Sequence, residues 1–220
     1  MHKPTYYGAA DASRLPCVKA HGLAFVEATP DSLKGYGTVV NDFDTANVEI
    51  VQWPAQGWRS IDPDTGNQGG IVEGLYDVWW EGEVLYGRNN AVRDTYLFGW
   101  SCDPQLASAE AKGTQPSELF FWHANYHPDG GQIFFPRERK PFVVPLALPG
   151  DDVKPEDFVA FYCDGTFGVH VNSGVWHEAP FPCAGRSSFK DKQGAIHARV
   201  SCDFVKEFGV YLQVPLQMSR

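Results

Sequence analysis

The sequence has no run of basic residues and is acidic overall. Its 220 residues include 18 Lys and Arg against 27 Asp and Glu, which gives a formal net charge of −9. Proteins bind nucleic acids through clustered Lys and Arg side chains that neutralise phosphates, so the composition argues against a nucleic-acid partner. An anionic substrate is still allowed, because a pocket can be locally positive on an acidic protein.

Long apolar segments and paired cysteine motifs are also lacking. No apolar run approaches the roughly 20 residues of a membrane-spanning helix, and the first residues lack the apolar core of a signal peptide. No CxxC pair occurs among the five cysteines, which are Cys17, Cys102, Cys163, Cys183 and Cys202. We therefore predict a cytoplasmic protein with reduced thiols and no membrane partner.

Helix signals are scarce, whereas strand and turn signals are frequent. The chain contains 22 Gly and 16 Pro and is 14% aromatic, a composition that suits short strands better than helix bundles. Turn residues separate most of the strand-like segments. These segments are 23–27, 37–40, 75–80, 83–86, 96–100, 119–127, 132–135, 142–147, 158–163, 167–171, 196–204 and 208–214. We predict an all-β sandwich or barrel with few short helices, one of them at 29–35.

The length fits one domain with a full hydrophobic core, and no internal repeat or linker is visible. We therefore predict a single domain over 1–220 with an elaborated N-terminal half. Residues 41–72 are rich in Asp, Asn, Gly and Pro, and residues 101–117 are mostly polar. Both segments are predicted insertions. The first could form a lid over the site or an arm on another subunit.

Two strand-like segments carry imidazoles among apolar residues. Alternate side chains of a strand share a face, so His123, Asn125 and His127 are expected to point the same way. The Asp-Gly-Gly sequence that follows predicts a hairpin, with Gln132 on the returning strand. His170 and His177 lie in the second segment. Polar faces in two apolar segments indicate one site built from two parts of the chain.

These segments resemble the ureidoglycolate lyase family, a branch of the cupin superfamily. The resemblance rests on 126–136, 141–152, 165–169 and 174–177, with a weaker similarity at 33–40. The His-Pro motif followed by Gln132, together with the Gly-x-Trp-His motif, is specific for the family. The resemblance implies a cupin-type jelly-roll barrel, a cytoplasmic homodimer, and cleavage of ureidoglycolate to glyoxylate and urea in purine (allantoin) breakdown.

By position, the resemblance places His127, Gln132 and His177 in the site, with Trp176 as a wall. Asn125 stands where the family usually has Glu. Two further positions depart from the family pattern, because Asn172 and Glu178 stand where the family usually has His. His170 lies two residues before Asn172 and so on the same face of the strand. It could therefore contact the substrate in place of the imidazole that the family has at position 172.

Many cupins hold a divalent metal ion with two His and one Glu from a hairpin and a third His from a later strand. Here His127 and His177 are the strong nitrogen donors, whereas Asn125 and Gln132 offer amide oxygens, which bind transition metals weakly. A catalytic zinc normally has about three good protein ligands. The sequence requires no cofactor, but it leaves open a zinc or manganese ion held by His127 and His177.

Imidazoles titrate near neutral pH and suit general acid–base chemistry. We predict His127 and His177 as the catalytic pair, in either order. Gln132 and Asn125 would orient a small carboxylate substrate. Arg199 either faces solvent or binds the substrate carboxylate with its guanidinium fork.

Two other functions fit the same pattern. One is another cupin enzyme, a metal-dependent isomerase, hydrolase or oxygenase that acts on a small polar carboxylate. Glu178 would favour this class, although a regular strand would turn it away from His177. The other is a cupin that binds a small molecule without catalysis. His21 and His197 are predicted to have no role in the site.

Overall fold

The computed structural model describes residues 19–218 except 52–56, 67, 114 and 197. Cys17 and His197 therefore lie outside the described residues. The strands in chain order are β1 (Lys19–Gly22), β2 (Ala24–Glu27), β3 (Gly37–Val40), β4 (Gln68–Glu81), β5 (Val84–Asn89), β6 (Asp94–Trp100), β7 (Glu118–Phe121), β8 (His123–Tyr126), β9 (Gln132–Pro136), β10 (Phe142–Ala147), β11 (Val159–Cys163), β12 (Gly168–Val171), β13 (Trp176–His177), β14 (Phe181–Pro182), β15 (Arg186–Ile196), β16 (Val200–Asp203) and β17 (Val210–Pro215). The helical elements described are η2 (Pro155–Asp157) and α1 (Phe204–Phe208).

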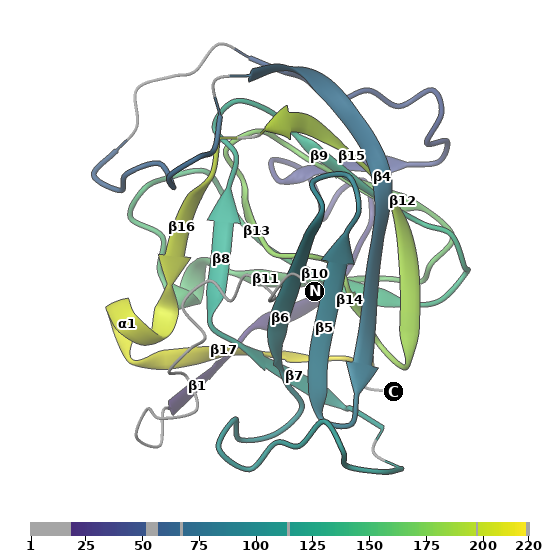
Figure 1. The fold of residues 1–220 in the computed structure, drawn as a ribbon, viewed down its shortest axis with the longest axis vertical. Coiled ribbons are helices and arrows are strands. Elements are labelled where there is room, and N and C mark those ends of the chain that lie inside the picture. The colour runs from purple at the N-terminus through teal and green to yellow at the C-terminus, as the bar shows by residue number, and fades with distance from the viewer. Residues whose placement is uncertain (1–18, 52–56, 67, 114, 197, 219–220) are drawn as a thin grey trace.

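The strands form two sheets. The large sheet has the order β1-β17-β7-β6-β5-β4-β15-β9-β12-β3. The small sheet has the order β16-β8-β13-β10-β11-β2, with β14 beside β10. Figure 1 shows β8 and β16 on one side of the molecule and β4, β5 and β6 on the other. The predicted all-β, cupin-like fold is confirmed. No helix among the described residues is long and apolar enough to cross a membrane.

One hydrophobic core joins the two sheets. Phe142 of β10 and Phe189 of β15 meet with ring centroids 5.0 Å apart, and both rings are fully buried. Phe121 and Phe181 make a similar edge contact at 5.2 Å. Such aromatic pairs hold the sheets together largely through buried apolar area. The core thus fixes the separation of the two sheets, which carry the polar residues described below.

The predicted hairpin across residues 123–136 is wrong, because its two strands belong to different sheets. β8 pairs with β13 and β16 in the small sheet, whereas β9 pairs with β12 and β15 in the large sheet. The intervening residues cross between the sheets. Gly131 lies in this crossing, where a Cβ atom would come within 2.5 Å of His170 Nε2. The sequence pattern identifies strands and turns, but it does not identify the partners of each strand.

Three local predictions also differ from the structure. Residues 30–36 form turns rather than a helix. The predicted strand 119–127 is divided at Trp122 into β7 and β8. β15 was not predicted, because its Arg, Ser, Lys, Asp and Gln residues hide the apolar alternation of a strand. Its burial between β4 and β9 explains how a polar segment forms the centre of a sheet.

Candidate functional site

A cavity of about 430 Å³ is lined by residues of both sheets. β4, β5, β6, β9 and β15 contribute from the large sheet, and β8 and β13 contribute from the small sheet. The structure brings five of the predicted site residues together in this cavity. They are Asn125, His127, Gln132, His177 and Arg199.

Strand register places the first of these side chains. His177 of β13 pairs directly with Asn125 of β8, so both side chains lie on the same face of the small sheet. His123 shares this face, since it is two residues before Asn125, and it also lines the cavity. The Oδ1 atom of Asn125 is buried without a hydrogen-bond partner among the described residues. This oxygen is therefore available to a donor on a bound molecule.

Backbone contacts hold the ring of His127. Its Nδ1 lies 3.1 Å from the carbonyl oxygen of Ala198. Ala198 in turn donates its backbone N–H to both carboxylate oxygens of Asp129, at 2.9 and 3.0 Å. A carbonyl oxygen only accepts, so Nδ1 carries the proton and Nε2 is the basic nitrogen of the neutral ring. The rings of His127 and His177 meet edge to face with centroids 5.0 Å apart.

His177 is connected to a buried carboxylate through Gln132. His177 Nδ1 lies 2.8 Å from the carbonyl oxygen of Val175, and its Nε2 lies 3.3 Å from Gln132 Oε1. The amide nitrogen of Gln132 donates to Asp191 Oδ1 at 2.7 Å. Burial lowers the pKa of His177, while the Val175 carbonyl and the charge of Glu178 act in the opposite direction.

Sequence reasoning missed Asp191, which is fully buried. Its Oδ2 accepts hydrogen bonds from the side-chain amides of Asn89 at 3.0 Å and Gln193 at 2.9 Å. Burial raises the pKa of Asp191 to about 6, although the amide donors of Gln132 and Asn89 lower it. A lone carboxylate in a polar strand gives no signal for such a role. The role of Asp191 arises because β15 is buried in the folded protein.

A second imidazole–carboxylate pair lies in the same cavity. His123 Nδ1 is 2.9 Å from Glu178 Oε2, and both residues line the cavity. The expectation that Glu178 faces away from His177 is wrong. β13 ends at His177, so strand alternation no longer applies to Glu178, and its Oε1 accepts from the backbone N–H of Ala179 at 3.0 Å. The chain therefore places a carboxylate in the cavity despite having Asn at position 125.

Arg199 enters the cavity instead of facing solvent. Its side chain is 14% exposed, and its Nε donates to Asp62 Oδ2 at 2.7 Å. Ser201 Oγ donates to the same oxygen at 2.7 Å. Asp64 and Thr65 line the cavity beside Arg199. Part of the predicted insertion 41–72 thus forms a wall of the cavity.

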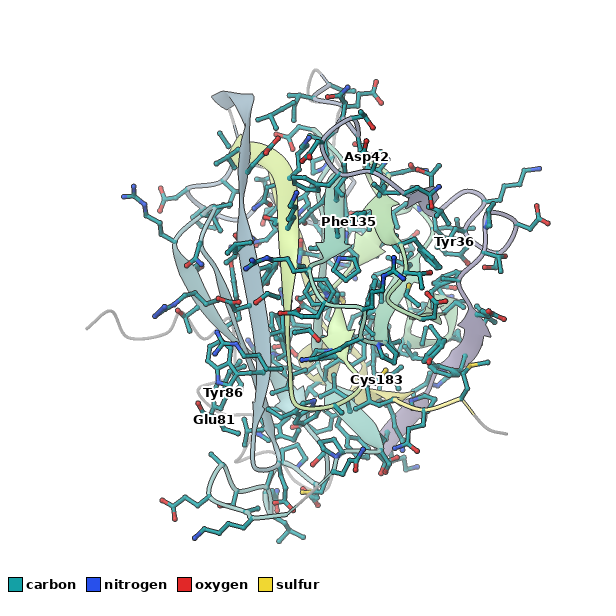
Figure 2. The ribbon with its side chains drawn as sticks, turned by 90° about the vertical axis from the view of Figure 1, so that its right-hand side faces the viewer. Tyr36, Asp42, Glu81, Tyr86, Phe135 and Cys183 are labelled. Atoms are coloured by element: carbon teal, nitrogen blue, oxygen red, sulfur yellow. The ribbon has the colours of Figure 1, made fainter. Side chains whose placement is uncertain are left out.

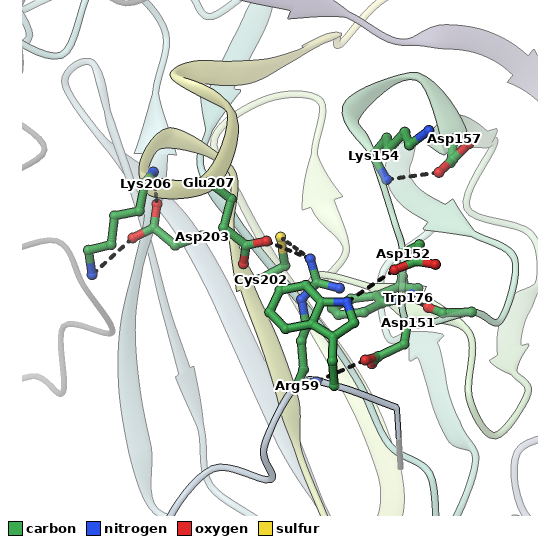
Figure 3. Close-up of polar contacts among 12 residues, drawn as sticks. Arg59, Asp151, Asp152, Lys154, Asp157, Trp176, Cys202, Asp203, Lys206 and Glu207 are labelled. Carbon is green, nitrogen blue, oxygen red and sulfur yellow. Dashed lines mark hydrogen bonds and ion pairs between the residues drawn. The ribbon is translucent and has the colours of Figure 1, made fainter.

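The segment before Asp62 is fastened to the outer face of the small sheet. The guanidinium of Arg59 is buried, lies 2.6 Å from Glu207 Oε2 and contacts the Sγ of Cys202 (Figure 3). The backbone N–H of Arg59 donates to Asp151 at 2.8 Å. The chain therefore runs from the outer face at Arg59, past the edge strand β16, to the cavity at Asp62.

Two predicted substrate-binding residues lie outside this cavity. Trp176 is adjacent to His177 and so occupies the opposite face of the small sheet, where its Nε1 donates to the carbonyl oxygen of Gly150 at 2.6 Å. His170 pairs with Ile133, which packs in the outer cluster with Phe43. Asp42 and Phe135 mark this outer region in Figure 2. Strand alternation separates both residues from Gln132.

The donor set of the cavity does not fit a divalent metal ion. Among the described residues, no group of three or more His, Cys, Asp and Glu side chains is placed to hold one. His127 and His177 each direct Nδ1 to a backbone carbonyl, and His177 directs Nε2 to Gln132. The two imidazoles are therefore oriented by hydrogen bonds in a way that suits proton transfer.

Comparisons with known proteins match part of the chain. Residues 113–203 match the family model described as Ureidoglycolate lyase. The ureidoglycolate lyase of Azotobacter vinelandii is 43% identical over 75 residues, which are 34% of this chain and 45% of that protein. The Stutzerimonas stutzeri enzyme is 36% identical over 98 residues, or 43% and 56% of the two chains. The Pseudomonas syringae pv. syringae enzyme is 36% identical over 103 residues, or 43% and 61%.

The chain spans about half the length of these curated relatives. The region matched by the family model contains His127, Gln132, His177 and Asp191. The cavity wall formed by β4, β5, β6 and residues 64–65 lies outside it.

Proposed function

We propose that the chain, whose residues 113–203 match the family model described as Ureidoglycolate lyase, cleaves ureidoglycolate, or a close analogue, to glyoxylate and urea. The observation that carries the proposal is the pairing of His127 and His177 in one cavity, with ring centroids 5.0 Å apart. By analogy with the family, we also propose a cytoplasmic homodimer.

The chemistry calls for two proton-transfer groups close together. Ureidoglycolate is a carbinolamide, in which a hydroxyl and a ureido nitrogen are attached to the same carbon. A base removes the hydroxyl proton while an acid protonates the departing nitrogen, and the C–N bond breaks as the aldehyde forms. Two imidazoles at this separation can contact both groups of one carbon. No metal ion takes part in this proposal.

The cavity also offers groups that suit the rest of the substrate. The guanidinium of Arg199 can bind the substrate carboxylate in a bidentate manner. The buried Oδ1 of Asn125 suits an N–H donor of the ureido group. Gln132 contacts His177 and holds it in the cavity. Trp176 and His170 have no part in this arrangement, because they lie on other faces of the sheets.

The test is release of urea and glyoxylate from racemic ureidoglycolate by the purified protein. The assay is run after metal chelation and again after addition of zinc or manganese. We expect turnover that is unchanged by chelation. Turnover that appears only with added metal would contradict the proton-transfer role of the two imidazoles.

A changed substrate within the same reaction class is the second candidate. Asn125 and Glu178 both line the cavity, and the family usually has Glu and His at these positions. Turnover of another small carbinolamide acid in place of ureidoglycolate would favour this candidate. If the protein binds these compounds but turns over neither, that result would support a non-catalytic binding protein.

A further inference from the structure

The hydrogen bonds that join His177, Gln132 and Asp191 restrict where protons can lie. His177 Nδ1 faces the carbonyl oxygen of Val175, and His177 Nε2 faces Gln132 Oε1. Both oxygens can only accept hydrogen bonds. With the amide in this orientation, both ring nitrogens of His177 must therefore carry a proton. Asp191 is then a carboxylate that accepts from Gln132 Nε2.

The opposite orientation of the Gln132 amide leads to the same proton count. Its oxygen would then face Asp191 Oδ1 across the 2.7 Å contact, and two acceptors this close require a proton on the carboxyl group. His177 would be neutral and would accept from the Gln132 amide nitrogen. In either orientation, the three residues together hold one proton more than a neutral imidazole and a carboxylate.

The surroundings of Asp191 favour this sharing. No ion pair among the described residues reaches Asp191, and its Oδ2 already accepts two amide hydrogen bonds. The protonated His177 is therefore the nearest compensation for its charge along the hydrogen-bond chain. Burial raises the pKa of Asp191 to about 6, and it lowers the pKa of His177. The two pKa values are thus shifted from their usual values in opposite directions, toward each other, which favours sharing of one proton along the chain.

Other titratable groups surround the pair. Glu178 favours the protonated form of His177, whereas the nearby His123 disfavours it. His127 packs edge to face against the His177 ring. Tyr76 of β4 lies close to Asp191, and burial keeps its phenol protonated by raising its pKa well above the usual value. None of these groups replaces Gln132 as the direct link between His177 and Asp191.

We propose that Asp191 is a positioning residue that acts through Gln132 to make His177 the proton donor of the reaction, which leaves His127 as the base. This inference rests on the proposed function. His127 Nε2 takes the hydroxyl proton of the substrate as the C=O bond forms. The C–N bond breaks, its electron pair goes to the ureido nitrogen, and the protonated His177 transfers to that nitrogen the Nε2 proton that it otherwise donates to Gln132 Oε1. Solvent then returns one proton to His177 and removes one from His127.

The test observes His177 directly and does not depend on turnover. Protein with ¹⁵N-labelled histidine is titrated by NMR from about pH 5 to 9, and the His177 signal is identified with His177→Gln. Asp191→Asn keeps the shape of the side chain. Its amide can donate to Gln132, which can then donate to a neutral His177, so the chain of hydrogen bonds forms without the additional proton. We expect the titration midpoint of His177 to fall by about one pH unit or more in this variant. The alkaline limb of kcat/KM is expected to move down by the same amount.

Two further variants keep the test decisive. Gln132→Met retains Asp191 but removes the side-chain amide that links it to His177, so the titration midpoint of His177 should fall as in Asp191→Asn. If Asp191→Asn does not fold, Gln132→Met alone tests the inference. Asp77→Asn is the matched control, because Asp77 also lies in the β4–β15 pair but bonds to Ser188 and Arg186 outside the cavity. An unchanged His177 midpoint in both test variants would overturn the inference. If wild type lacks turnover but the midpoint shifts, the proposed function fails while the proton-sharing chain stands.

Discussion

Glu178 Oε2 lies 2.9 Å from His123 Nδ1, inside the cavity that also holds His127 and His177. A carboxylate at this distance fixes the tautomer and the orientation of an imidazole. The pair exists because β13 ends at His177 and the chain turns Glu178 inward. The cavity is therefore lined by two imidazoles that are each connected to a carboxylate, His123 directly to Glu178 and His177 through Gln132 to the buried Asp191.

Removal of the Glu178 charge should impair the cavity without unfolding the protein. In Glu178→Gln, the amide keeps nearly the same shape but no longer fixes the His123 ring as an anion does, so we expect kcat/KM for ureidoglycolate to fall by about tenfold or more. Steady-state kinetics check this. Glu207→Gln is the matched control, since Glu207 pairs with Arg59 outside the cavity. Equal kcat/KM in the two variants would argue against any role for the pair.

Loss of the His177 imidazole should nearly abolish turnover. We expect kcat of His177→Ala to fall by about 10²- to 10⁴-fold, the usual contribution of a general acid or base. Urea release measures the effect, and circular dichroism confirms that the sheets are intact. His21→Ala serves as the control, because His21 lies in β1 and does not line the cavity. Retained turnover in His177→Ala would remove His177 from the mechanism.

Arg199 should affect substrate binding more than the chemical step. Arg199→Lys keeps the positive charge but loses the planar fork, so we expect KM to rise by about tenfold with little change in kcat. Initial-rate kinetics over a range of ureidoglycolate concentrations separate the two constants. Arg186→Lys is a suitable control, because Arg186 is 63% exposed and pairs with Asp77 away from the cavity. An unchanged KM in Arg199→Lys would place the substrate carboxylate elsewhere.

Lys192 should be important for stability. Its buried ammonium donates to the carbonyl oxygens of Phe43 and Ala46, and these two hydrogen bonds fasten residues 43–46 to β15. The ammonium also pairs with Glu73. Lys192→Met leaves these acceptors without their donor, so we expect a loss of about 2–3 kcal/mol in the free energy of unfolding.

Urea denaturation measures this loss, and Lys190→Met provides the comparison. Lys190 is 41% exposed and pairs with the exposed Asp44, so its replacement should cost less than about 1 kcal/mol. Similar midpoints for the two variants would show that burial of Lys192 contributes little.

The sequence predicted the all-β fold and most strands, because apolar alternation and turn residues are local signals. It also indicated that His127, Gln132 and His177 belong to one site, since their motifs resemble a known family. Asn125 followed from the same alternation as His127. These predictions depend on residues close together in the chain.

Only the tertiary structure decided which residues share the cavity. The assignment of β8 and β9 to different sheets depends on long-range pairing, which a local pattern does not encode. Asp191 became a buried partner of Gln132 because the polar strand β15 lies between β4 and β9. Glu178 turned inward because β13 stops one residue earlier, and Arg199 did so because Asp62 holds it. The sequence by itself determined the strands and the imidazoles, and long-range packing determined their partners, because burial and charge compensation arise only when distant segments meet.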